Sequence, residues 1–196
     1  MDVRADRVGE VVATSTASFT AQCYRLHQAP PLGTLVCAGS PPVYGVVFSI
    51  TTEPLEPGRV ILARGADSPD EEALFQENPH LGRLLATRFD CLIVGYQEGE
   101  AIRQGLPPLP PRIHSFVSCA SPETVHAFLL DLAFLHLLLA PGTTEADEAL
   151  AALLRKASTH SPDGQEAFLR RAGYALAMEL ARDAPRLHAL LRRLAP

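Results

Sequence analysis

Cysteine and histidine are the residue types of this sequence best suited to metal binding or nucleophilic chemistry. The cysteines lie in apolar, strand-like runs without CxxC spacing; they are Cys23, Cys37, Cys91 and Cys119. Isolated thiols of this kind are typical of buried cysteines in a reducing compartment. The alternative is a zinc site that combines them with His27 or His114, or a small-ligand or metal site that uses Cys119, His114 and Cys91. We expect neither a metal nor a cofactor.

The basic side chains exclude one large class of enzymes. Lys156 is the only lysine among the 17 lysine and arginine residues. A phosphate-binding loop needs a lysine in the pattern GxxxxGK[ST], but Lys156 lies in the glycine-free stretch LLRKASTH, which reads as helix. The motifs GxGxxG, GxSxG and HExxH are missing from the sequence as well. Glu71 and Glu72 read as solvated carboxylates at a helix start. Because the sequence has no P-loop and no recognisable catalytic motif, we expect a non-enzymatic protein, and the alternative is a small-ligand or metal-binding barrel with an enzymatic activity.

The formal net charge of -5 gives no overall positive field that would gather nucleic acid. Direct nucleic-acid binding is therefore a minor hypothesis, which requires five arginines to cluster in the fold. They are Arg59, Arg64, Arg88, Arg103 and Arg112.

Nothing in the sequence predicts a membrane segment. The opening stretch MDVRADRVGEVV has no apolar core of the kind that signal peptides need. The most apolar run, 128–140, is short and is interrupted by Asp131 and His136. We expect a cytoplasmic protein.

Residues 1–120 read mainly as strands. The stretch 18–26 alternates with period 2 and puts Phe19, Ala21 and Cys23 on one face, as in a half-buried strand. A helical excursion is expected at about 67–88, with Ser68 as its cap and Pro69 at its first position. The other predicted strands, separated by Gly and Pro turns, are 7–14, 34–38, 42–51, 58–65, 89–97 and 112–120.

Residues 121–196 read as helices. Ser121 and Pro122 are typical of a helix start, and the first helix is expected to reach about residue 139. Thr144 is expected to cap the next helix, and Asp163 with Glu166 resembles a capping box before a third. A short helix at 185–194 follows. The apolar stripes at helical spacing in the second and third helices read as core.

These patterns predict an α+β fold. Short strands at regular intervals favour a small N-terminal β-barrel at 1–120 with a helical insertion. A C-terminal region of three to four helices at 121–196 is expected to follow.

Three short motifs resemble the HAS barrel, the small N-terminal barrel shared by HerA-type DNA-translocating ATPases and F-type ATP synthase subunits. They are VGEVV at 8–12, PLGTLV at 31–36 and VYGVV at 43–47. The whole chain is similar to stand-alone HAS-barrel proteins found chiefly in cyanobacteria, which have no established activity. The matches are ARG at 63–65, NPHLGRLL at 78–85, IRQGLPPLPPRIHSFV at 102–117, and two helical stretches, DEALAALLRKAS and EAFLRRAGYALA.

This resemblance implies a role in assembly, since HAS barrels of the ATPases form ring contacts or dock partners such as a nuclease. The motor domain that follows those barrels is replaced here by about 75 helical residues. ATP hydrolysis and DNA translocation are therefore not carried over.

The proline stretch PPLPPR at 107–112 has two compatible interpretations. It contains the PxxPxR pattern of polyproline ligands, and it also lies between two strand-like runs, where prolines stiffen a connection. The candidate partner-binding residues are Arg103, Pro107, Pro108, Pro110, Pro111, Arg112 and His114. The sequence thus predicts a non-enzymatic assembly or protein-interaction module with a protein partner or self-association. In this interpretation the chain is an oligomer or an adaptor to an ATPase or a nucleic-acid-processing partner.

Overall fold

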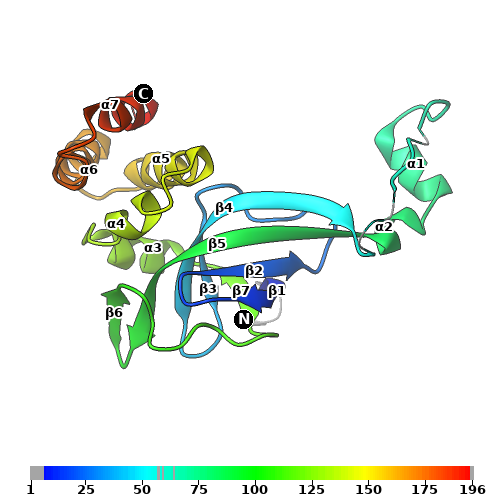
Figure 1. The fold of residues 1–196 in the computed structure, drawn as a ribbon, viewed down its shortest axis with the longest axis horizontal. Coiled ribbons are helices and arrows are strands. Elements are labelled where there is room, and N and C mark those ends of the chain that lie inside the picture. The colour runs from blue at the N-terminus through cyan, green and yellow to red at the C-terminus, as the bar shows by residue number, and fades with distance from the viewer. Residues whose placement is uncertain (1–6, 57, 59, 64, 195–196) are drawn as a thin grey trace.

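The computed structural model describes residues 7–194 except 57, 59 and 64, and it has a mixed α+β architecture (Figure 1). Seven antiparallel strands form the sheet, with helices gathered at its two ends. The strands are β1 (Arg7–Thr14), β2 (Ser18–Cys23), β3 (Leu35–Ala38), β4 (Val43–Pro54), β5 (Leu85–Glu98), β6 (Ala101–Gln104) and β7 (Phe116–Cys119). The predicted strands at 7–14, 18–26, 34–38 and 42–51 are confirmed to within a few residues.

The strand order is β2-β1-β7-β3-β4-β5-β6, and β2 also pairs with β5. Hydrogen bonding therefore runs from β2 through five other strands and back to β2. Only β6 lies outside this circuit, as the second strand of a hairpin with β5. Strands of this circuit contribute an apolar cluster that includes Val11, Phe19, Val47 and Phe89.

The period-2 prediction for β2 is confirmed. Phe19, Ala21 and Cys23 are buried in that cluster, while Thr20 and Gln22 are only partly buried. Alternation holds because successive side chains of a strand point to opposite faces, and only one face of β2 meets the core.

The predicted strand at 58–65 is wrong for the described residues of that range. The pairing of β4 with β5 ends at Pro54 and Leu85, so no neighbouring strand accompanies this stretch. Val60 and Ile61 favour strands, but their backbone has no neighbouring strand with which to form hydrogen bonds. Both side chains are exposed.

The helical excursion is confirmed in part, as α1 (Glu71–Glu77) and α2 (Leu81–Leu84). They lie beyond the end of the β4–β5 hairpin, opposite the C-terminal helices (Figure 1). Asp70, not Ser68, is the N-cap, because its carboxylate accepts the Ala73 amide at 2.7 Å. Residues 85–88, expected to be helical, belong to β5 because β4 offers them a strand partner.

The C-terminal part contains five described helices rather than three to four. They are α3 (Pro122–Leu129), α4 (Leu135–Leu139), α5 (Thr144–Ser158), α6 (Gln165–Glu179) and α7 (Ala184–Leu194). The first predicted helix is broken after Leu129, where the Asp131 carboxylate accepts the amides of Leu132 and Ala133. Such local side-chain bonding competes with the helical hydrogen bonds.

Helix starts were predicted with mixed success. Ser121 caps α3 as expected, through the Thr124 amide at 3.2 Å. Thr143 caps α5 in place of Thr144. The capping box of Asp163 is wrong, because Gly164 occupies the cap position of α6 with φ 86°, and a glycine has no side chain to accept the amides.

A second apolar cluster joins the sheet to the C-terminal helices. It contains Tyr44, Val46 and Val94 from the outer face of the sheet, together with Phe134 and Leu150 from the helical part. The predicted stripes of α5 and α6 belong to it: Leu150, Leu153, Leu154, Phe168, Ala172, Leu176 and Leu180 are buried.

Gly33 marks the closest approach between the two parts. Its φ is +76°, and a Cβ at this position would lie 2.6 Å from the Ala149 carbonyl oxygen and 2.7 Å from the Leu153 nitrogen, both in the backbone of α5. Only glycine fits both requirements, the left-handed backbone and the contact with the helix.

None of the helices in the described residues has the length and apolar character that a membrane crossing would need.

Candidate interaction surface and cavity

The proline stretch connects β6 to β7 and is held at both ends by backbone hydrogen bonds. The Gly105 amide donates to the Val94 carbonyl at 3.2 Å, and the His114 amide donates to the Val11 carbonyl at 2.8 Å. The Val11 amide donates in turn to the Ser115 carbonyl at 2.9 Å. The connector is thus fixed to β5 and to β1.

Its prolines divide into anchors and displayed residues. Pro107 and Pro111 are buried and Pro110 is partly buried, whereas Pro108 is exposed. Large apolar side chains between and beside the anchors are also exposed: Leu109, between them, is 78% exposed, and Ile113, after Pro111, is 48% exposed. We call the exposed residues Leu106, Pro108, Leu109 and Ile113 the proline ridge.

The charged candidates lie around the ridge but are partly neutralised. The Arg103 Nε contacts the Glu98 carboxylate at 2.9 Å, and the His114 Nδ1 lies 3.3 Å from the Glu10 Oε1. Arg112 is exposed, and its side chain has no carboxylate partner among the described residues. His114 has φ 66°, a left-handed backbone that is uncommon for a residue other than glycine.

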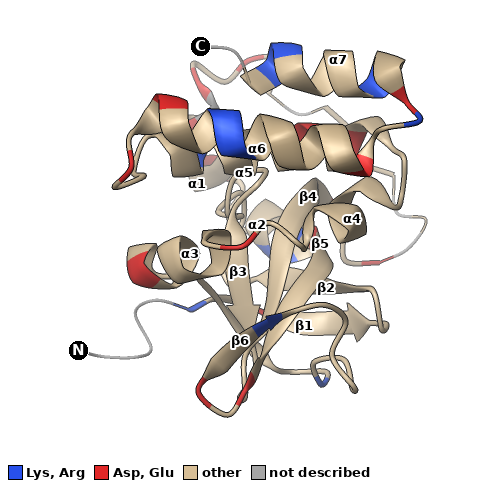
Figure 2. Cartoon of the chain, turned by 90° about the vertical axis from the view of Figure 1, so that its left-hand side faces the viewer, with Lys and Arg blue, Asp and Glu red and all other residues tan. Residues whose placement is uncertain are grey.

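The arginine cluster required for nucleic-acid binding is not seen in the described part. Arg59 and Arg64 lie outside the described residues. Arg88 contacts Glu53 at 2.7 Å and Arg103 contacts Glu98. Figure 2 shows basic and acidic segments interspersed over α6 and α7 rather than one basic face.

The cysteines do not form a metal site with histidine. Within the part of the chain that the structure describes, no group of three or more Cys, His, Asp or Glu side chains could hold a metal ion. Cys91 is fully buried in the apolar cluster of the sheet, Cys119 is exposed at the end of β7, and His114 lies against Glu10.

The thiol pKa values follow from burial. Burial raises the pKa of Cys23 and of Cys37 to about 11, and that of Cys91 well above its ordinary value. Burial also raises the pKa of Cys119, while the positive charge of Lys156 acts in the opposite direction. All four are therefore protonated thiols near neutral pH.

Sequence reasoning missed a cavity of about 310 Å³ between the sheet and helices α3, α5 and α6. Its wall comes from four separate stretches of the chain, 31–35, 119–130, 153–163 and 168–171. The sequence feature that could have drawn attention to this cavity is Lys156, the single lysine of the chain.

A second hollow, of about 450 Å³, lies beside α1 and α2 and is lined by Val60, Ile61, Leu62, Leu74 and Phe75, among others.

Comparison with known proteins adds no identification. No family model matches the chain, and no curated protein matches it either.

Proposed function

We propose that this chain is a non-enzymatic protein-interaction module in which the proline ridge is the docking surface for a protein partner. The observation that carries the proposal is the division of the prolines, with Pro107 and Pro111 buried as anchors and Leu109 and Ile113 displayed between and beside them.

The anchoring matters because binding costs conformational entropy. A segment already fixed by proline φ angles and by backbone bonds at both ends loses little freedom when a partner binds. The Leu109 side chain, which is 78% exposed, can then bury apolar area against a partner, and its backbone loses little conformational entropy on binding. A connector that only bridged two strands would not need large apolar side chains turned toward solvent.

The scaffold in this proposal is a small closed barrel of the HAS type. The hydrogen-bonding circuit that begins and ends at β2 supports closure, and the apolar cluster that its strands share supports a common interior. The motifs that resemble HAS barrels lie in this circuit: 8–12 in β1, 31–36 at the start of β3 and 43–47 in β4.

The test compares two single substitutions at equally exposed positions. Leu109→Asp places a charge on the ridge, and Met178→Asp places one on α6, where Met178 is 80% exposed. Both variants must first show the wild-type melting temperature. Proteins captured from native cells by the wild-type chain are then purified and titrated against all three chains.

A partner that binds the wild type and Met178→Asp equally, and Leu109→Asp at least about tenfold more weakly, supports the proposal. Equal binding of all three chains would refute it and would move the search to the exposed apolar residues beside α1. Sedimentation at several protein concentrations shows whether the partner is a second copy of this chain.

A further inference from the structure

The cavity between the sheet and the C-terminal helices has the character of a small-molecule site. Its volume of about 310 Å³ falls at the lower end of the range found for ligand pockets. The apolar part of its wall is Leu35, Val125, Leu129, Leu153, Ala157 and Phe168. It is partly open to solvent, so a ligand has a path of entry.

Two cations border this apolar wall without a described carboxylate partner. Lys156, at the end of α5, makes no ion pair within the described residues. Arg171, on α6, donates from Nη2 to the Leu129 carbonyl at 3.0 Å, and its remaining donors have no described partner. Its guanidinium carbon lies 5.4 Å from the centre of the Phe168 ring, which orients the group along the wall.

What sets Lys156 and Arg171 apart is their position beside an apolar cavity, since other exposed arginines such as Arg112 and Arg192 also have no ion pair within the described residues. One acid, Asp163, and two histidines, His126 and His160, which are counted as neutral here, border the cavity as well. The formal charge of Lys156, Arg171 and Asp163 together is therefore +1, which suits a single negative charge.

We infer that this cavity binds a small amphipathic carboxylate, with its apolar body against the wall and its carboxylate beside Lys156 and Arg171. An ionised carboxylate accepts charge-assisted hydrogen bonds from both side chains. Lys156 and Arg171 are exposed side chains, so a neutral ligand would bind without the charge-assisted hydrogen bonds that a carboxylate gains, and a dianion would be opposed by Asp163. The inference is independent of the proline ridge, which lies on a different connection of the sheet.

The experiment titrates the whole protein with three probes of one chain length: octanoate, 1-octanol and octylammonium. Isothermal titration calorimetry gives an affinity for each. We expect saturable binding of octanoate at one site, weaker binding of 1-octanol, and octylammonium weaker than octanoate by at least about tenfold.

Three variants locate the site. Lys156→Gln is expected to weaken octanoate binding by about tenfold or more, whereas the exposed Arg192→Gln on α7 removes the same charge elsewhere and is expected to leave it unchanged. Ala157→Leu fills part of the cavity and is expected to weaken octanoate and 1-octanol alike. Melting curves verify that each variant folds.

A second readout needs no variant. Because Lys156 is the only lysine, reductive methylation with ¹³C-formaldehyde gives a single lysine NMR signal. Octanoate is expected to shift this signal with the same saturation curve as the calorimetry. The inference is overturned if octanoate does not bind saturably, if octylammonium binds equally well, or if neither Lys156→Gln nor the lysine signal responds.

Discussion

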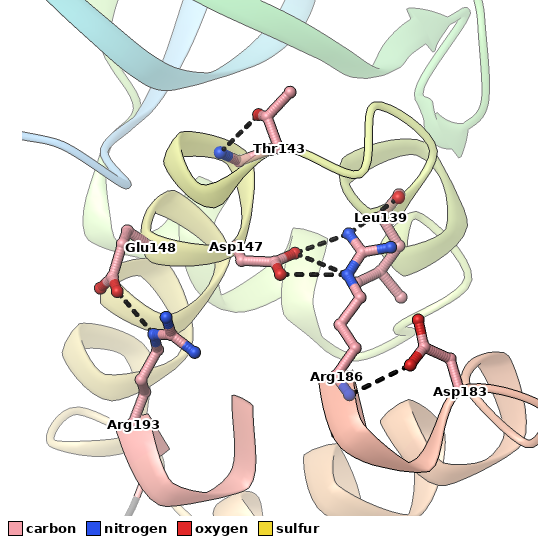
Figure 3. A network of polar contacts seen from close by, with 8 residues as sticks. Leu139, Thr143, Asp147, Glu148, Asp183, Arg186 and Arg193 are labelled. Carbon is pink, nitrogen blue, oxygen red and sulfur yellow. Dashed lines mark hydrogen bonds and ion pairs between the residues drawn. The ribbon is translucent and has the colours of Figure 1, made fainter. Parts of the chain in front are cut away.

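The ion pair between Asp147 on α5 and Arg186 on α7 gives a quantitative test of how the helical part is held together. The Arg186 Nη2 lies 2.6 Å from the Asp147 Oδ1, and the Arg186 Nε lies 3.0 Å and 3.1 Å from the two carboxylate oxygens (Figure 3). The same guanidinium donates to the Leu139 carbonyl at 2.9 Å. The Arg186 side chain is only 20% exposed, and the Asp147 side chain only 12%.

Asp147→Asn keeps the shape of the side chain but leaves the Arg186 charge without its counterion. Removing one partner of a buried pair costs about 3–5 kcal/mol, and the partial exposure of this pair puts the expected loss near 3 kcal/mol. For a chain of this size that corresponds to a fall in melting temperature of roughly 6–12 °C. Arg186→Met is expected to be similarly destabilising, because it strands the carboxylate and the Leu139 carbonyl.

The assay is urea unfolding of the wild type, both single variants and the double variant. We expect the double variant to recover about 2 kcal/mol relative to the sum of the single losses, since neither charge is then buried alone. Glu148→Gln is the matched control, because the neighbouring Glu148–Arg193 pair is 40% and 30% exposed and is expected to contribute less than about 1 kcal/mol. A coupling below about 0.5 kcal/mol, or a control as damaging as Asp147→Asn, would refute this reasoning.

Three further predictions concern the junction between sheet and helices. Gln104→Leu removes three hydrogen bonds, which its amide makes with the backbone of the α3–α4 break, so we expect urea unfolding to show a loss of about 2–3 kcal/mol. Gly33→Ala is expected to cost about 3 kcal/mol, because it adds a collision with α5 to the backbone strain. Gly142→Ala, at a similar φ of +67° with nothing within 4 Å, isolates the strain and is expected to cost only about 1 kcal/mol; equal losses at the two glycines would contradict the collision. In the native protein, iodoacetamide is expected to modify Cys119 well before the other cysteines. Lys156→Gln is expected to raise the pKa of Cys119 and to slow its modification about twofold to fivefold at pH 8. An unchanged rate would show that the lysine charge does not reach the thiol.

The parts of the fold that the sequence predicted are those set by local periodicity. The alternation in β2 and the stripes of α5 and α6 each repeat often enough to identify the buried face. The start of α3 was predictable because Ser121 and Pro122 act within one turn. The strand β6 was missed because its four residues, AIRQ, are too few and too polar to show a period.

The failures came from interactions between distant segments. The stretch 58–65 has the residues of a strand, but it lacks a neighbour to pair with. The break after Leu129 depends partly on Gln104, 25 residues earlier, whose side chain satisfies backbone groups there. The cavity could not be predicted at all, because its wall joins Gly33, Val125 and Phe168 from three separate parts of the chain. The proline stretch was predicted as a connector, and its position between β6 and β7 agrees, but the alternation of anchors and displayed side chains required coordinates.

The contact of Gly33 with α5 bears on how such a chain can change through evolution. A break in the gene near residue 120 would separate two surfaces that now cover each other. Tyr44, Val46 and Val94 would be exposed to water on one fragment, and the apolar stripe of α5 would be exposed on the other. A different C-terminal segment could replace the present helices only if it also covered that sheet face and tolerated a glycine pressed against its backbone. The change in sequence character near residue 120 is therefore a poor point for exchanging modules, and the two parts are constrained to diverge together.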